Sequence, residues 1–362
     1  MKFGLLHFFE HPAGGKTEHQ LVKEQLDCLR AAEDMGFDYI WAPEHHSTEY
    51  GHCASPMLTL SAMATVTKRI RLGSAVVVLP FNDPIRIAEE SALIDLISDG
   101  RLDFGVGRGF QPTEYRAFDI DQSKSGEVFD EALEVIIRAW TQESVSFDGV
   151  HFDIKSQTVR PKPLQKPHPP VWMAAISDRT FAAAGRRGFN LLCSLIYGFK
   201  SYQLADLIAT YRAALRAGGH NPDEHEVGAS CFVYCAESNE QARQDFGAPV
   251  LWYYRTIANY LAPPRTQGPV EGYESYAGMR QSAQTVKWDE LLENGVLVCG
   301  NPASCITQIE ELQSKYGFTQ LLCWTRLAGL DHRKVLKSME LMQRHVMPHF
   351  KRANHGKPGA VT

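Results

Sequence analysis

The chain has 362 residues, a formal net charge of −5 and a hydrophobic fraction of 44%. This length exceeds a usual single core, but one α/β barrel with insertions accommodates it. The mildly acidic balance gives no electrostatic footprint for nucleic acid, and no stretch is apolar for the length of a membrane span. Residues 1–6 enter a strand-like pattern directly, without a signal-peptide cleavage site. We therefore expect a cytoplasmic protein with neither nucleic acid nor membrane as partner.

Cysteine usage points to a reducing compartment. No pair forms a C-x-x-C motif, and most cysteines lie in apolar surroundings, which is typical of reduced, buried thiols. Two of them, Cys231 and Cys235, are four residues apart in a strand-like run, too far for a comfortable disulfide. The eight cysteines are at positions 28, 53, 193, 231, 235, 299, 305 and 323.

Short apolar runs alternate with longer amphipathic ones, a pattern typical of βα units and a parallel sheet. Several helices are announced by a polar cap followed by proline, as at Ser55-Pro56, Asp83-Pro84 and Asn301-Pro302. The predicted strands are 2–8, 38–42, 70–79, 101–106, 171–175, 190–194, 227–235 and 319–324. The predicted helices are 19–35, 55–67, 84–99, 126–141, 177–188, 202–217, 239–260, 301–315 and 331–350.

Eight strands alternating with helices predict an α/β fold, a single (β/α)8 TIM barrel over residues 1–350 with a polar tail at 351–362. A doubly wound open sheet is the alternative, but no G-x-G-x-x-G follows the first strand. An Asp-Gly turn at 148–149 predicts a β-hairpin insertion within 145–160. Residues 262–285 show no period, which is typical of a long lid, a binding loop or disorder.

The second predicted strand is followed by two carboxylates and two adjacent imidazoles within Glu44–Glu49. Functional groups at the carboxyl end of a strand are typical of α/β active sites. A solvated loop rich in histidine is the alternative. A metal site is disfavoured, because His45 and His46 are adjacent and do not make the i,i+4 pair of a helical zinc motif.

Two further stretches follow strands that share the mouth of such a barrel. Arg108 lies between Gly107 and Gly109, where it could bond a carbonyl or phosphate, or form a surface ion pair. Ser177 begins a helix whose first turn could hold an anion, but Asp178 favours simple capping instead. Three tryptophans in apolar runs are assigned to the core: Trp172, Trp252 and Trp324.

Several segments, taken in order over nearly the whole chain, resemble the bacterial luciferase-like, flavin-dependent monooxygenase family, and its alkanal-oxidising luciferase α subunit in particular. The matching segments are Met1–Gly4, Gly36–Asp38, Glu44–His46, Thr48–Gly51, Gly73–Val76, Gly100–Arg101, Phe104–Gly109, Gly300–Pro302 and Val346–Pro348. The resemblance implies a (β/α)8 barrel that binds reduced FMN at the carboxyl ends of its strands. It implies further that a separate reductase supplies FMNH2, that O2 adds at the flavin C4a, and that the peroxide oxidises a small organic substrate.

The resemblance also assigns roles to residues. His45 would be the catalytic imidazole, and Glu44 would contact flavin through its backbone. The Ala75–Val76 bond would be a non-proline cis peptide below the isoalloxazine. The phosphate would be met by Arg108 and, at the helix start, by Ser177, Arg179 and Thr180. The family's mobile lid would correspond to 262–285, and its pairing of barrels through helices near the start of the chain implies a homodimer.

The chain departs from luciferase at two places. Gly107 stands where luciferase has cysteine, and the turn at 176–180 lacks luciferase's acid-and-small-residue run, so light emission is not predicted. Two alternatives to an FMN-dependent monooxygenase stay open. One is an F420-dependent reductase or dehydrogenase of the same superfamily. The other is a non-catalytic flavin-binding subunit.

Overall fold

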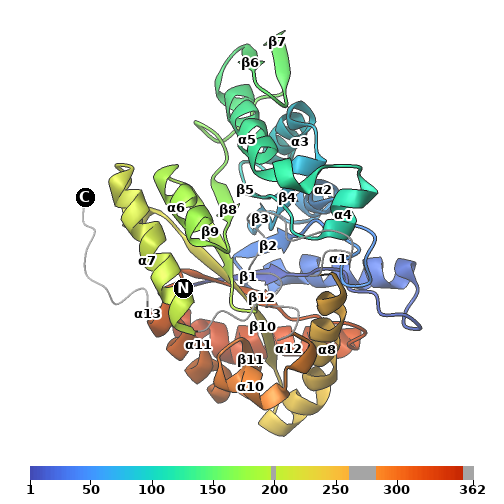
Figure 1. Cartoon of the computed structure of the whole chain (residues 1–362). Coiled ribbons are helices and arrows are strands. Elements are labelled where there is room, and N and C mark those ends of the chain that lie inside the picture. Colours follow the sequence, from blue (N-terminus) through green and yellow to red (C-terminus); the bar gives the residue numbers. More distant parts are fainter. Residues whose placement is uncertain (197–200, 261–282, 354–362) are drawn as a thin grey trace.

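The structure, a computed structural model, describes residues 1–196, 201–260 and 283–353. Eight parallel strands close into a barrel, since β10 pairs with β9 on one side and with β12 on the other. Helices surround this barrel (Figure 1). The predicted (β/α)8 fold is therefore confirmed. In order around the barrel its strands are β1 (Lys2–Leu6), β2 (Tyr39–Ala42), β3 (Arg71–Ser74), β5 (Leu102–Gly107), β8 (Val171–Ala174), β9 (Asn190–Ser194), β10 (Val227–Cys235) and β12 (Gln320–Trp324).

Two short strands extend the barrel at its carboxyl end. The predicted strand 70–79 is divided in two, because the Ala75–Val76 peptide is cis and separates β3 from β4 (Val77–Val78). The second, β11 (Leu297–Gly300), was not predicted. It pairs with the last four residues of β10, beyond the point where β9 ends.

The predicted caps hold the helices as expected. The side chains of Ser55, Asp83 and Asn301 accept hydrogen bonds from backbone N–H groups three residues on, at 3.2, 3.0 and 2.9 Å. The helices are α1 (Glu18–Asp34), α2 (Pro56–Val66), α3 (Pro84–Ile97), α4 (Pro112–Ala117), α5 (Ser125–Thr141), α6 (Asp178–Arg186), α7 (Ser201–Ala217), α8 (Asn239–Tyr260), α10 (Trp288–Glu293), α11 (Pro302–Tyr316), α12 (His332–Leu341) and α13 (Met347–Ala353). A π-helical turn, Met342–Val346, joins the last two.

The predicted hairpin insertion is present as β6 (Val145–Asp148) and antiparallel β7 (Asp153–Gln157), and it projects beyond α5 at the top of Figure 1. The carboxylate of Glu131 on α5 accepts the backbone N–H groups of three residues in its turn, at 2.8, 2.9 and 3.1 Å. The insertion is therefore tied to the barrel's helices. The loop predicted at 262–285 lies outside the described residues apart from 283–285.

The barrel interior is filled by aromatic side chains. The fully buried rings of Trp41 and Trp172 meet edge to face at a centroid distance of 5.1 Å. Gly73 is required beside them, because a Cβ there would lie 2.3 Å from the Trp41 ring. All eight cysteines are buried and none is in a disulfide, as predicted.

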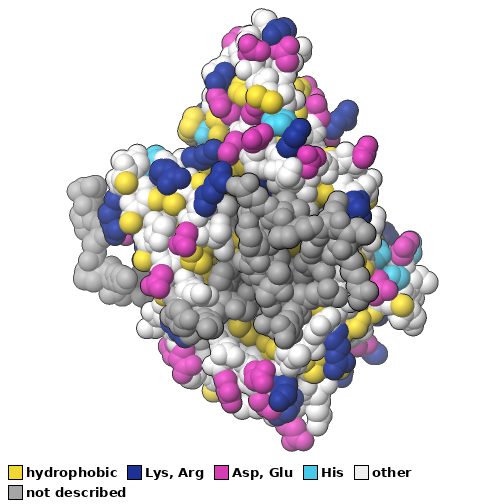
Figure 2. All heavy atoms as spheres, viewed as in Figure 1, with side chains coloured by type: hydrophobic (Ala, Val, Ile, Leu, Met, Phe, Trp, Pro, Cys, Tyr) yellow, Lys and Arg dark blue, Asp and Glu magenta, His cyan; other side chains and the backbone are white. Residues whose placement is uncertain are grey.

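The surface carries charges of both signs, interspersed rather than gathered in one large patch on the face in Figure 2. Within the described part of the chain, every helix falls short of the length and apolarity that crossing a membrane requires.

Candidate active site

Strand register brings the predicted site residues to one end of the barrel. Ala42 of β2 pairs with Ser74 of β3, so Glu44 and Val76, each two residues further on, leave the sheet side by side. Val106 of β5 pairs with Met173 of β8 in the same way. Arg108 and the turn before α6 therefore follow neighbouring strands at the same carboxyl end.

His45 is buried, with 8% of its surface exposed. Its Nδ1 lies 3.0 Å from the Glu114 carboxylate, and its Nε2 lies 2.6 Å from the Tyr50 hydroxyl. The loop after β2 folds back over the imidazole, which Gly51 makes possible: a Cβ at this glycine would lie 2.7 Å from the Cβ of His45. Packing therefore explains why glycine stands at position 51, since a side chain there would clash with His45.

Glu44 braces two loops with its side chain. One carboxylate oxygen accepts the Val78 backbone N–H at 2.8 Å, and the other accepts the Asn82 amide at 3.0 Å. His46 Nε2 lies 3.1 Å from the same carboxylate. The predicted cis peptide, Ala75–Val76, is present in the segment that this brace holds. The contact of Glu44, Ala75 and Val76 with flavin stays a prediction.

Arg108 follows β5 as predicted, and its guanidinium lies near the start of α5, where a Cβ on Gly126 would be 3.6 Å from Nη1. Packing explains why glycine flanks Arg108 on both sides, a role that was not predicted from the sequence. A Cβ on Gly107 or Gly109 would lie 2.7 Å from Val76 or 2.8 Å from Val78. These glycines let the end of β5 lie against the segment that contains the cis peptide.

The start of α6 combines capping with exposure. The Thr180 hydroxyl accepts the backbone N–H groups of Ile176 and Ser177, each at 3.1 Å, and the Ser177 hydroxyl lies 3.2 Å from it. These contacts form a helix cap, which is the alternative to anion binding that the presence of Asp178 favoured. Arg179 is exposed, and both hydroxyls are partly exposed. The predicted phosphate contacts of these three residues remain a prediction.

Sequence analysis missed Glu114 and Gln111, which both reach His45 from α4 and its cap. Glu114 is 1% exposed, and besides Nδ1 it accepts the His46 backbone N–H at 2.9 Å. The Gln111 amide nitrogen lies 3.1 Å from the same Nδ1. Gln111-Pro112, a helix start directly after the glycine-rich strand end, was a signal that could have placed them here.

Aromatic rings form a wall beside His45. Phe8 stacks on the imidazole at a centroid distance of 5.3 Å and on Trp324 at 3.8 Å. The Trp324 indole N–H donates to the fully buried carboxyl of Glu10 at 2.5 Å. Burial raises the pKa of Glu10 to about 8, although this indole and Arg326 act in the opposite direction. Trp324 is therefore buried as predicted, but it also holds a titratable group at the site.

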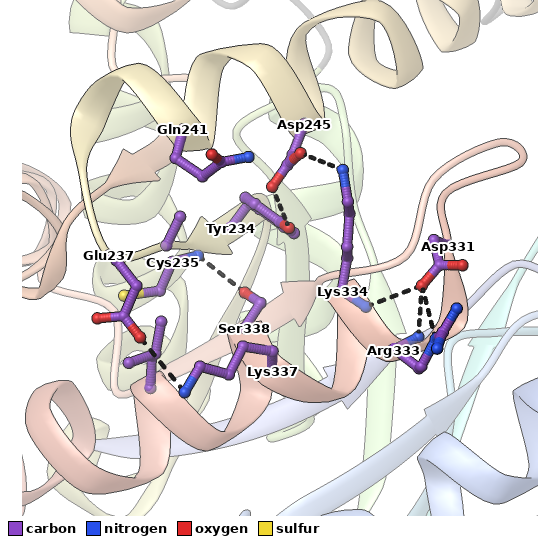
Figure 3. Close-up of a pocket in the computed structure, with 12 residues that line it drawn as sticks. Tyr234, Cys235, Glu237, Gln241, Asp245, Asp331, Arg333, Lys334, Lys337 and Ser338 are labelled. Carbon is purple, nitrogen blue, oxygen red and sulfur yellow. Dashed lines mark hydrogen bonds and ion pairs between the residues drawn. The ribbon is translucent and has the colours of Figure 1, made fainter.

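A separate cavity of about 540 Å³ lies outside the barrel, between α8 and α12 (Figure 3). Lys334 reaches across it from α12 to Asp245 of α8 at 2.5 Å, and Lys337 pairs with Glu237 at 3.3 Å. None of the predicted site residues lines this cavity, and its principal charges are paired with each other. We do not assign it to the chemistry.

Known proteins that are similar to this chain in sequence or fold include several monooxygenases. A flavin-dependent trigonelline monooxygenase, oxygenase component, from Acinetobacter baylyi is 26% identical over 97% of this chain and 96% of its own length. An alkanal monooxygenase alpha chain from the Kryptophanaron alfredi symbiont is 25% identical over 97% of this chain and 99% of its own. The crystal structure of a monooxygenase from Streptomyces bottropensis matches with a TM-score of 0.85 and 27% identity, over 97% of this chain and 100% of the other.

The family model of luciferase-like monooxygenases matches residues 1–320. The predicted resemblance is thereby confirmed, together with the prediction that the chain is an enzyme of this kind. The chain belongs to the luciferase-like monooxygenase family.

Proposed function

We propose that the protein is the oxygenase of a two-component system, which uses FMNH2 and O2 to oxidise a small organic substrate. The observation that carries this proposal is the buried imidazole of His45, at the same barrel end as the cis peptide Ala75–Val76 and the cationic Arg108. When bound, reduced FMN would supply the two electrons that the transfer of one oxygen atom from O2 to the substrate requires.

The residues present suit FMN by their chemistry. Arg108 offers a guanidinium, and the start of α6 offers hydroxyls, Arg179 and helix N–H groups, a donor set that suits a phosphate. The aromatic wall of Phe8 and Trp324 beside His45 suits a planar ring system. Arg108, Ser177, Arg179 and Thr180 would hold the phosphate end.

The chain's own groups would position and protect the reaction. His45 would hold or move a proton on the side of the reacting oxygen, which requires an imidazole kept in one orientation. The Glu44 brace would fix the segment containing Ala75 and Val76 relative to that imidazole. The buried rings of Phe8 and Trp324 would exclude water from the same side.

The test begins anaerobically. Purified protein is mixed with photoreduced FMN, O2 is added, and the absorbance spectrum is followed. We expect a long-lived species distinct from both reduced and oxidised FMN, because a closed site slows the loss of the oxygen adduct. Reoxidation at the rate of free FMNH2, with no flavin retained, would contradict the proposal and favour the F420-dependent or the non-catalytic alternative.

A His45→Ala variant tests the catalytic assignment. We expect product formation to fall by about 10² to 10⁴-fold, the usual contribution of a positioned acid or base. A His349→Ala variant is the matched control, because that histidine is exposed on α13, where it pairs with Glu310 at 2.6 Å. Equal product yields from His45→Ala and the parent would remove the catalytic role.

Two partners belong to the proposal. A separate flavin reductase would supply FMNH2, in keeping with the words "oxygenase component" in the name of the A. baylyi relative.

A second copy of the chain would cover α2 and α3, which pack together. These helices expose five apolar side chains: Leu58 and Val66 on α2, and Leu93, Leu96 and Ile97 on α3. Light scattering should give twice the chain mass of 40.5 kDa, and a monomeric mass would refute the homodimer. A cytoplasmic location also stays a prediction.

A further inference from the structure

The two nitrogens of His45 are both engaged, each by a different buried group. Glu114 Oε1 lies 3.0 Å from Nδ1, and the Tyr50 hydroxyl lies 2.6 Å from Nε2. Tyr50 is fully buried and Glu114 is 1% exposed, so both contacts are shielded from water. We infer that Glu114 is a positioning residue that fixes His45 as its Nδ1–H tautomer, and that Tyr50 joins the imidazole in a proton relay that ends at the Tyr50 hydroxyl. This inference rests on the proposed function for its chemical use, but not for its geometry.

The charge of Glu114 decides which nitrogen carries the proton. Glu114 Oε1 also accepts the His46 backbone N–H at 2.9 Å, so this oxygen already acts as an acceptor beside the imidazole. A carboxylate oxygen beside an unprotonated Nδ1 would set two lone pairs against each other. Nδ1–H therefore donates to Glu114, and Nε2 is left as the acceptor for the Tyr50 O–H.

Gln111 offers the competing arrangement. Its amide nitrogen lies 3.1 Å from Nδ1 and could donate to an unprotonated nitrogen there, which would move the ring proton to Nε2. That arrangement would leave Tyr50 to accept from Nε2–H and Glu114 without its charge-assisted bond. A hydrogen bond to an ionised group is about twice as strong as a neutral one, so Glu114 should prevail over Gln111.

The relay can store one proton and return it. When Tyr50 Oη takes a proton from a reacting O–H group, its own proton passes to Nε2 of His45. The imidazolium that forms keeps Nδ1–H on Glu114, and the reactant retains the electron pair of the broken O–H bond. The reverse sequence delivers the proton back, so the relay needs neither an oxidant nor a reductant.

The test reads the tautomer directly, without flavin. The chain has 14 histidines, so His45 is assigned in spectra of ¹⁵N-histidine-labelled protein by the signals that a His45→Gln variant lacks. We expect Nδ1 protonated in the parent and the proton redistributed to Nε2 in Glu114→Gln. Tyr50→Phe should keep Nδ1 protonated but shift the Nε2 resonance. An Nε2–H tautomer in the parent, or identical spectra of parent and Glu114→Gln, would overturn the inference.

Turnover adds a second readout. Tyr50→Phe should lower kcat about 10²-fold with KM within about twofold, since the relay acts in the chemical step. Tyr211→Phe is the matched control, because it also removes a buried hydroxyl, one that donates to the Phe189 carbonyl at 2.8 Å away from the site. Unchanged kcat in Tyr50→Phe would overturn the relay. If FMNH2 supports no turnover at all, the proposed function fails and the tautomer alone decides this inference.

Discussion

Two sets of buried polar groups at opposite ends of the barrel differ in how completely they are hydrogen-bonded. At the amino end, Arg101 directs its guanidinium to four backbone carbonyls and the Thr67 hydroxyl, at 2.7 to 3.1 Å. At the carboxyl end, Glu10 and Glu114 each keep one buried carboxylate oxygen without a hydrogen-bond partner in the part of the chain that the structure describes. The Arg101 guanidinium therefore has its donors engaged by the protein, whereas Glu10 and Glu114 each keep an acceptor oxygen that a ligand or a proton could use.

The largest effect should come from Glu10. Burial raises its pKa from 4.5 to about 8, so the folded protein holds this proton more tightly than the unfolded chain does. Its contribution to stability is complete below about pH 4.5 and is lost as the pH rises to about 8, a change on the order of 5 kcal/mol. In Glu10→Gln the side chain stays neutral, so the free energy of unfolding at pH 8 should exceed that of the parent.

Urea unfolding between pH 6.5 and 8 isolates this effect. His7 works in the opposite sense, since burial lowers its pKa from 6.5 to about 3, but its contribution is confined to the range below pH 6.5. Burial raises the pKa of Asp103 to about 6, so most of its effect on the free energy of unfolding is complete by pH 6.5. If the free energy of unfolding of Glu10→Gln and of the parent changed in parallel with pH, Glu10 would not be the group that titrates in this range. Glu49→Gln, an exposed carboxyl in the nearby loop, is the control.

Arg101→Ala should be the most damaging change at the amino end. It removes five donors at once and leaves buried carbonyls of Ala64, Thr67, Ile70 and Ser98 without those partners. We expect a loss of about 3 to 5 kcal/mol in the free energy of unfolding, as for other broken buried charge networks. Chemical unfolding measures it. A loss below about 1 kcal/mol would show that the amino end is not where stability is concentrated.

Arg108→Ala should have a smaller effect, and on binding instead. Removing a charge-assisted bond to a phosphate should weaken FMN affinity about 10 to 100-fold. Equilibrium dialysis with FMN measures the change. Arg69→Ala is the control at the opposite end, where that exposed side chain makes a loose 3.9 Å contact with Glu33. If both variants bind FMN equally well, the phosphate assignment fails.

Most of the fold was predictable because hydrophobic period and caps are local signals. All eight barrel strands and the Asp-Gly hairpin were placed in this way. The four residues of β11 were missed, although predicted strands such as β2 and β8 are equally short. The division of the third strand at Ala75–Val76 came from the family resemblance, because nothing in those two side chains announces a cis bond.

Site residues that directly follow a predicted strand could be identified from the sequence, whereas site residues elsewhere in the chain could not. His45, Glu44 and Arg108 each come directly after an apolar run. Glu114 lies on the short helix α4, and it meets His45 through tertiary folding across 69 positions of sequence. Tyr50 was visible within the histidine-rich stretch, but its bond to Nε2 depends on a loop that folds back over the ring, which no pattern in the sequence specifies.

The buried cysteines make the protein its own unfolding indicator. Burial raises the pKa of Cys28, Cys53, Cys193 and Cys231 to about 12, so these thiols are neither accessible nor ionised in the folded enzyme. A colour-forming thiol reagent should therefore count near zero groups in the native protein and eight after denaturation. Its rate of reaction would follow opening of the barrel directly, without a label. A monooxygenase of this kind thus keeps its thiols away from oxidants for as long as it stays folded.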